Sequence, residues 1–222
     1  MTAKRSVTRS LRDRNRLAAR EAVLDAAERL LQSSATAEFS MRALAAEAGV
    51  GFVTPFNHFG GKTAIIQALS ARVIGRMAER FRNEAREGDD IDRVLAMSGV
   101  ASSLLLERPA VYKAVVGSLG MVSPAPSAVW AQSRELWTLA LGDLSGLAAD
   151  RDVAVGALAA QLAIGFRGCL SFWIAGEITD GDLAKAAAAS SASVLLGFAG
   201  AERRGLLLET IAAGPAPAAV SG

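Results

Sequence analysis

The chain has 222 residues, of which 51% are hydrophobic, 5% are aromatic and one is cysteine, and its formal net charge is +2 at pH 7. The single cysteine, Cys169, excludes an intrachain disulfide, and the small net charge by itself identifies no class of partner. The N-terminus lacks the apolar segment of a signal peptide, and Arg167 interrupts the most apolar stretch, 153–178. We therefore expect a cytoplasmic protein without a membrane helix.

The composition favours helices. Aromatic residues are few, so leucine and alanine, the residue with the highest helix propensity, must fill the core. No run of Val or Ile alternates with polar residues as in a half-buried strand, so we predict an all-α fold. The first twenty residues hold seven Lys or Arg against Asp13 alone. We predict that residues 1–16 form a basic flexible arm, which either contacts phosphates or is only a solvated tail.

The next segment, 17–62, contains three predicted helices. Apolar residues at helical spacing predict the first over 17–31. Ser40 is a suitable N-cap for the second, Gly49 suits its left-handed end, and a third is expected over 51–58. Two short helices joined by a three- to four-residue turn with a glycine are the helix-turn-helix pattern of DNA-binding proteins.

A longer amphipathic pattern follows and predicts a connecting helix within 63–88. Residues 89–211 are expected to form a second helical domain, and the Gly- and Pro-containing segment 212–222 a disordered tail. The helices predicted in the second domain are 91–106, 109–118, 126–146, 151–176 and 180–200. Residues 206–211 are expected to form either one further helical turn or a docked extension. Asp180 is the predicted N-cap of the last long helix.

A family signature is visible in the string from Val50 to Lys62, VGFVTPFNHFGGK. It resembles the recognition-helix region of the TetR family of bacterial transcriptional regulators, and 23–31 and 40–45 are similar to that family's first two helices. The resemblance covers about 17–70. It implies an N-terminal three-helix DNA-binding domain and a C-terminal helical ligand-binding and dimerisation domain. It also implies a homodimer, built mainly from the last two long helices, on a double-stranded DNA operator that a small effector releases.

The same resemblance assigns the DNA contacts. Ser40 is expected to cap the second helix near a phosphate, and Arg42 in its first turn to reach a base edge or the backbone. The N-terminal part of the third helix meets bases, and Phe56, His58 and Lys62 match phosphate-contacting positions. The predicted DNA-binding residues are Ser40, Arg42, Phe52, Val53, Thr54, Phe56, Asn57, His58 and Lys62.

Three residues depart from the family pattern. Gly51 replaces the usual serine cap, Pro55 lies about one turn into the third helix, and Phe56 replaces the commoner tyrosine. Each change removes hydrogen-bonding capacity, so binding to the DNA backbone is expected to depend on the basic arm and on Lys62.

Large or polar residues in the middle helices are candidates for an effector cavity, although most of them also fit a plain core role. Arg167 needs a partner, water or an anion, supplied by an effector or by a second subunit. Small residues at Gly156, Ala160, Gly165 and Gly168, and the Ala/Ser run after 183, allow close helix packing between two chains or within one. The ligand-binding candidates are Tyr112, Met121, Trp130, Arg134, Trp137, Phe166, Arg167, Cys169, Phe172 and Trp173.

These patterns favour a dimeric DNA-binding repressor released by a small apolar or aromatic effector. Two alternatives remain: an architectural or partner-recruiting regulator without an effector, and a helical enzyme or small-molecule carrier. The enzyme hypothesis lacks a catalytic constellation, because the one histidine, His58, and Cys169 fall in different domains, and no metal-spaced cluster or phosphate loop appears. We therefore expect no enzyme activity, no cofactor and no metal.

Overall fold

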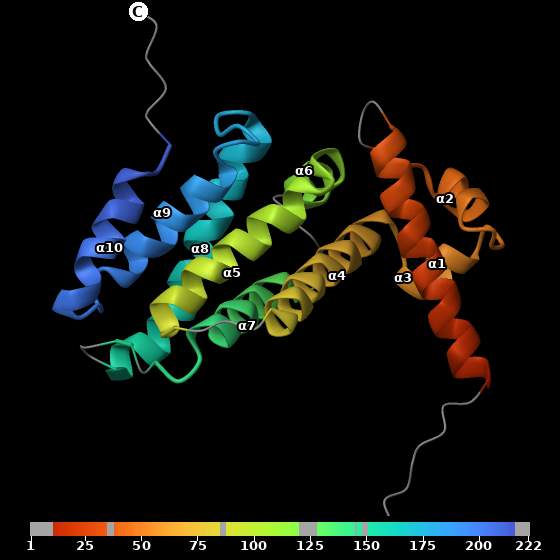
Figure 1. The fold of residues 1–222 in the computed structure, drawn as a ribbon. Helices are drawn as coiled ribbons and strands as arrows, with labels where there is room; N and C mark the ends of the chain where they lie inside the picture. The colour runs from red at the N-terminus through yellow and green to blue at the C-terminus, as the bar shows by residue number, and fades with distance from the viewer. Residues whose placement is uncertain are drawn as a thin grey trace, which may run out of the picture. The chain divides into compact units, whose positions relative to one another are not determined.

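The computed structural model describes residues 11–34, 38–84, 88–119, 128–144, 146–147 and 151–215. These residues are helical apart from turns and one isolated β-bridge between Leu147 and Ala199, so the predicted all-α fold is confirmed within them. The chain divides into two compact units after Leu69. In Figure 1 the helices are coloured by their order along the chain, from red at the N-terminus to blue at the C-terminus.

The N-terminal unit is built from three helices and the start of a fourth. The first three helices pack against one another in every pairing. Their apolar faces meet in a small core that contains Val23, Leu31, Phe39 and Leu44, all buried. The helices are α1 (Leu11–Ser33), α2 (Met41–Glu47), α3 (Thr54–Phe59) and α4 (Lys62–Asn83).

Two predictions for this unit are wrong in detail. The first helix begins at Leu11 rather than at residue 17, so residues 11–16 of the predicted flexible arm are helical. This segment contains neither Gly nor Pro, and its Leu and Arg residues favour helix. The third helix begins at Thr54 rather than at residue 51, because Pro55 suits a first helical turn, where its missing N–H costs nothing. The connection from α2 to α3 therefore runs from Ala48 to Val53.

The C-terminal unit contains the later part of α4 and six further helices. Helix α9 packs against α5, α8 and α10, while α8 also packs against α6 and α7. The largest fully buried side chains here include Trp137 on α7 and Trp173 on α8. The helices are α5 (Asp90–Leu106), α6 (Pro109–Ser118), α7 (Val129–Leu141), α8 (Arg151–Ala175), α9 (Leu183–Leu195) and α10 (Ala201–Ala212).

Three predictions for this unit need correction. Helix α7 ends before residue 146, because Gly142 adopts the positive φ of a helix end. Asp180 is not the cap of α9; the helix starts after Asp182, and Asp180 instead accepts hydrogen bonds from Trp173 and Lys113. The last segment is a twelve-residue helix, α10, rather than a single turn. The predicted disordered tail lies outside the described residues from 216 onward.

One described helical stretch, Gly156–Ala175 in α8, is long and apolar enough to cross a membrane. The helix continues through Arg167, which does not divide it as the sequence analysis assumed. Leu158, Leu162 and Trp173 on this stretch are almost completely buried among the other helices of the unit. Such burial is typical of a core helix, which can be as long and as apolar as a membrane-spanning one.

An ion-pair cluster joins α10 to the start of α5. Asp89 caps α5 by accepting from the backbone N–H groups of Ile91 and Asp92, and its own N–H donates to the Asp92 carboxylate. The Arg203 guanidinium on α10 binds both carboxylates, with 3.1 Å from its Nε to Asp89 Oδ2. Burial alone raises the pKa of Asp92, but the hydrogen bond from Arg203 and the backbone outweigh it, and the pKa lies below its ordinary value.

We expect Arg203→Met to lower the free energy of unfolding by about 1–2 kcal/mol near neutral pH, because two carboxylates lose a charged donor. A folded-state pKa that is depressed stabilises the fold above the unfolded pKa and ceases to do so as the pH falls through the folded pKa. The difference between variant and wild type, measured by denaturant unfolding, should therefore shrink in acid. Arg204→Met is the matched control, because Arg204 is an exposed neighbour whose guanidinium donates to the Leu196 carbonyl. A difference that persists unchanged in acid would contradict this account.

Candidate nucleic-acid interface and ligand cavity

The helix-turn-helix begins with a well-formed cap. Ser40 Oγ accepts from the Ala43 N–H at 3.1 Å, which satisfies one of the free donors at the start of α2. Gly49, with φ +64°, ends α2, and the Val50 N–H returns to the Ala45 carbonyl at 3.0 Å. A residue with a Cβ is strained at that φ, so the glycine is needed for the turn. These contacts hold α2 and α3 in the arrangement that the sequence predicted.

The start of α3 exposes apolar side chains. Phe52, Val53 and Phe56 are 55%, 60% and 38% exposed, respectively. The rings of Phe52 and Phe56 pack edge to face with 5.6 Å between their centroids. Pro55, in contrast, is buried in the unit. Contact between water and an exposed aromatic pair is unfavourable, so such a pair at the start of a short helix suits a surface that another molecule covers.

Basic side chains from α1 lie beside α3. A depression in the surface is lined by Asp13, Arg16, Leu17, Arg20 and His58. The Arg20 guanidinium lies over the Phe59 ring, 4.4 Å from its centroid. Arg16 and Arg20 are one helical turn apart, and residues four apart share a face of α1. From the sequence, Arg16 was expected in a flexible arm and Arg20 was given no role in the site. The available signal was that arginines recur at a spacing of four residues up to the first predicted helix.

The other predicted DNA-binding residues are accessible on the same unit. Ser40, Arg42 and Asn57 are exposed, and Thr54 is half-buried at the start of α3. Lys62 is exposed at the start of α4, with its Nζ 5.3 Å from the centroid of the Phe39 ring.

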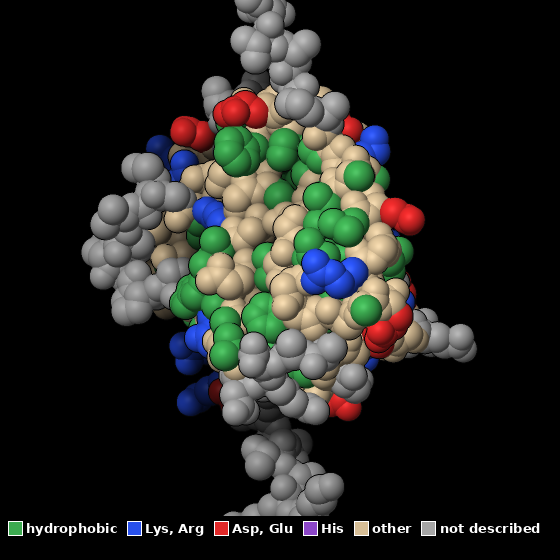
Figure 2. All heavy atoms as spheres, turned by 90° about the vertical axis from the view of Figure 1, so that its left-hand side faces the viewer, with side chains coloured by type: hydrophobic (Ala, Val, Ile, Leu, Met, Phe, Trp, Pro, Cys, Tyr) green, Lys and Arg blue, Asp and Glu red, His purple; other side chains and the backbone are tan. Residues whose placement is uncertain are grey.

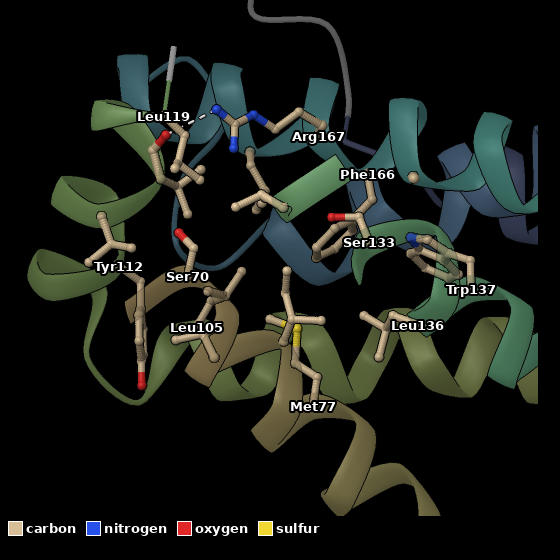
Figure 3. A pocket seen from close by; sticks show the side chains of 17 residues that line it. Ser70, Met77, Leu105, Tyr112, Leu119, Ser133, Leu136, Trp137, Phe166 and Arg167 are labelled. Carbon is tan, nitrogen blue, oxygen red and sulfur yellow. Dashed lines mark hydrogen bonds between the residues drawn. The ribbon is translucent and has the colours of Figure 1, made fainter. Parts of the chain in front are cut away.

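The C-terminal unit contains a partly open apolar cavity of about 70 Å³ between five of its helices (Figure 3). Its walls are mostly aliphatic, with the ring of Trp137 packed edge to face on Phe166 at 5.7 Å. The lining residues come from α4 (Ser70, Val73, Ile74, Met77), α5 (Leu105), α6 and its end (Tyr112, Val115, Val116, Leu119), α7 (Val129, Ser133, Leu136, Trp137) and α8 (Ala163, Phe166, Arg167, Leu170).

Few polar groups reach this cavity. The Arg167 guanidinium donates to the Val116 carbonyl at 3.1 Å, and burial lowers its pKa. The Ser70 hydroxyl is buried without a hydrogen-bond partner. Tyr112 contributes its ring, while its hydroxyl accepts from Arg76 at 3.4 Å and points away from the cavity in Figure 3. The sequence analysis missed Ser70, although a serine on the apolar stripe of the connecting helix was a usable signal.

The predicted ligand-binding candidates separate into distinct places. Tyr112, Trp137, Phe166 and Arg167 line the cavity. Cys169 and Trp173 are buried elsewhere, and burial raises the pKa of the Cys169 thiol. Three candidates, Trp130, Arg134 and Phe172, are exposed and do not line the cavity, and Met121 lies outside the described residues.

No group of three or more His, Cys, Asp or Glu in the described part of the chain could hold a metal ion.

Residues 23–69 match the family model of the bacterial regulatory proteins of the tetR family. The matched segment runs from the middle of α1 to the last residue of the N-terminal unit, and so contains the complete helix-turn-helix. The helix-turn-helix segment of this chain is therefore similar to that of the TetR family. Members of that family are DNA-binding transcriptional regulators and not enzymes.

Solved structures of TetR-family proteins have a similar fold. A TetR transcriptional regulator from Rhodococcus sp. RHA1 gives a TM-score of 0.68 at 22% identity, covering 82% of this chain and 97% of that one. A TetR-family regulator from Streptomyces coelicolor gives 0.59 at 20% identity, covering 89% and 90%. A gamma-butyrolactone receptor described as ArpA-like gives 0.51 at 17% identity, covering 89% and 96%. Among curated proteins, no sequence matches the chain.

We expect Ser40→Ala to lower the free energy of unfolding of the TetR-type helix-turn-helix by about 1 kcal/mol, because the Ala43 N–H loses its acceptor. Hydrogen exchange of α2 amides measures this locally. Ser40→Asp keeps the cap but adds negative charge, so it should preserve stability and weaken binding to duplex DNA. If the Asp variant binds DNA like wild type, Ser40 does not lie near a phosphate.

Proposed function

We propose that this TetR-family regulator is a cytoplasmic homodimeric repressor that leaves its DNA operator when a small effector fills the cavity of the C-terminal unit. The observation that carries the proposal is the surface formed by α2, α3 and the start of α1. It combines a capped helix-turn-helix with exposed apolar side chains and arginines.

Base contacts are assigned to Arg42 and to the segment Phe52–Thr54. Arginine can hold the two acceptors of guanine at once, and the exposed Val53 methyl groups suit a thymine methyl. Phe56 and Asn57 lie beside this segment and complete the contact surface. The early residues of a recognition helix meet the bases when the helix enters the major groove.

Phosphate contacts are assigned to Ser40, His58 and Lys62, with Arg16 and Arg20 added from α1. The two arginines and His58 line one depression, so they present donors to a single stretch of DNA backbone. This addition supports the expectation that basic residues before the helix-turn-helix compensate for the hydrogen bonds lost at Gly51, Pro55 and Phe56.

The dimer surface is assigned to α8 and its neighbours. Val153, Ile164 and Phe172 on α8 are each more than half exposed, and Gly156 lies on the same exposed stripe. Figure 2 shows hydrophobic side chains spread over the face of the molecule on which α9 and α10 lie in Figure 1. Gly165 is used within the chain instead, because a Cβ there would lie 2.6 Å from Ser190 Oγ on α9.

The effector site is assigned to the cavity between α4 and α8. The position supports control of DNA binding, because α4 is one continuous helix that starts at Lys62 and contributes Ser70, Val73 and Met77 to the cavity. A protein of similar fold is named a gamma-butyrolactone receptor, and that name supports a small-molecule ligand for this fold.

A second candidate function is a partner-recruiting or architectural regulator without an effector. The small volume of the cavity, about 70 Å³, favours it, since ordinary ligand pockets measure roughly 300–1,000 Å³. Release of the protein from DNA by any small molecule that binds the C-terminal unit decides between the two functions.

We expect Arg42→Ala and His58→Ala to weaken binding to the DNA fragment next to the protein's own gene by roughly 5- to 100-fold. Loss of a base contact relaxes the preference at one base pair, whereas loss of a phosphate contact weakens all sequences alike and lowers the salt dependence. Arg134→Ala, at an exposed arginine of the C-terminal unit, is the control. Fluorescence anisotropy at several salt concentrations makes the measurement, and unchanged affinity in both variants would refute the assigned contacts.

We expect Ile164→Glu to leave the protein folded, since this side chain is 52% exposed, and to weaken dimerisation by about tenfold or more. A carboxylate buried between two apolar faces has no partner there. Analytical ultracentrifugation over a concentration series compares it with Thr138→Glu, an exposed position on α7. Equal self-association in the two variants would place the interface elsewhere.

A further inference from the structure

The cavity contains a cation without a matching anion. Arg167 projects from α8, and its guanidinium has one hydrogen-bond acceptor in the described structure, the Val116 carbonyl. A guanidinium carries five N–H donors in a planar fork. Among the residues of the described chain that line the cavity, none is Asp or Glu. Burial lowers the pKa of Arg167.

A second donor in the same cavity also lacks an acceptor. Ser70 is 4% exposed, and its Oγ has no hydrogen-bond partner among the described residues. Serine hydroxyls within helices commonly donate to the carbonyl four residues earlier, and Ser98, Ser102 and Ser118 in this chain do so. Figure 3 shows the Ser70 hydroxyl pointing into the space across which Arg167 lies. A buried hydroxyl without a partner is unfavourable unless something else supplies one.

We propose that the cavity binds a small monocarboxylate, with the carboxylate held by Arg167 and Ser70 and an apolar body among the surrounding aliphatic and aromatic side chains. The proposal rests on the effector role already assigned to this cavity and specifies its chemistry. A carboxylate has two acceptor oxygens, fits the arginine fork and accepts from a hydroxyl at the same time. A cation would be repelled, and a hydrocarbon would leave both donors unmatched.

The size of the cavity favours compact ligands. About 70 Å³ holds a few water molecules but only part of a typical ligand. Ile74 and Met77 form part of the wall on α4, and methionine changes rotamer readily to fit irregular shapes. A ligand with a six-carbon chain or one aromatic ring is therefore expected to enlarge the cavity by moving the α4 wall.

Calorimetry on the full-length protein without DNA tests the proposal with two matched pairs, hexanoate against hexanamide and phenylacetate against phenylacetamide. Each amide has the shape of its acid but no charge. We expect the carboxylates to bind and the amides to bind about 10- to 100-fold more weakly, the value of a hydrogen-bonded charge. Amides that bind as well as the acids, or carboxylates that do not bind at millimolar concentration, would overturn the proposal.

Two substitutions, Arg167→Met and Ser70→Ala, test whether these side chains bind the carboxylate. Arg167→Met keeps an apolar chain of similar length, and the Val116 carbonyl keeps a donor, because the Leu119 N–H also binds it at 3.2 Å. We expect this variant to lose the preference for acids over amides, and Ser70→Ala to reduce it. Arg134→Met and Ser118→Ala, outside the cavity, should match wild type. An acid preference that survives in both Arg167→Met and Ser70→Ala would overturn the assignment, and the wild-type acid–amide comparison stands even if a variant does not fold.

The carboxylate proposal and the proposed function can fail independently of each other. Binding of DNA is measured without carboxylate, and binding of carboxylate is measured without DNA. Failure of DNA binding with intact carboxylate binding refutes the repressor function alone, whereas the reverse result refutes only the ligand chemistry proposed here.

Discussion

The apolar face of α4 is the constraint on which both units depend. Ile65, Ile66 and Leu69 at its beginning are buried in the N-terminal unit, while Val73 and Met77 are buried farther along the same stripe and line the cavity. Burying a large aliphatic side chain contributes about 1.5–3 kcal/mol, so neither unit can release this helix without a large cost. One unbroken helix therefore carries buried side chains that belong to both units.

The helix-turn-helix relies on packing and geometry more than on polar groups of its own recognition helix. Val53 caps α3 without a side-chain hydrogen bond, Pro55 removes an N–H, and Phe56 presents a ring. The ring of Phe52 packs against that of Phe56, and Arg16 and Arg20 of α1 line a depression together with His58 of α3. If these cations contact DNA phosphates as proposed, the affinity for DNA depends strongly on salt.

Much of this organisation could be predicted from local sequence signals. Helical periodicity and the caps at Ser40 and Gly49 predicted the helix-turn-helix, since those signals act within one or two turns. The predicted boundaries of α3 and α7 were wrong, because Pro55 favours the first turn of a helix and Gly142 favours the end of one. Among the ligand candidates, residue type alone could not separate Trp137, which lines the cavity, from Trp130, which is half exposed. That difference depends on which helices pack against α7, whereas Ser70 could have been found from its place on the apolar stripe of the connecting helix.

Selection of duplex DNA from a random-sequence pool by the full-length protein, followed by sequencing, tests the central claim most directly. The account predicts enrichment of a recurrent sequence made of two inverted half-sites, because a homodimer presents the α2–α3 surface twice. Arg42→Ala should blur or remove the enriched sequence while the protein remains folded. A folded wild-type protein that enriches no sequence over the starting pool would contradict the account.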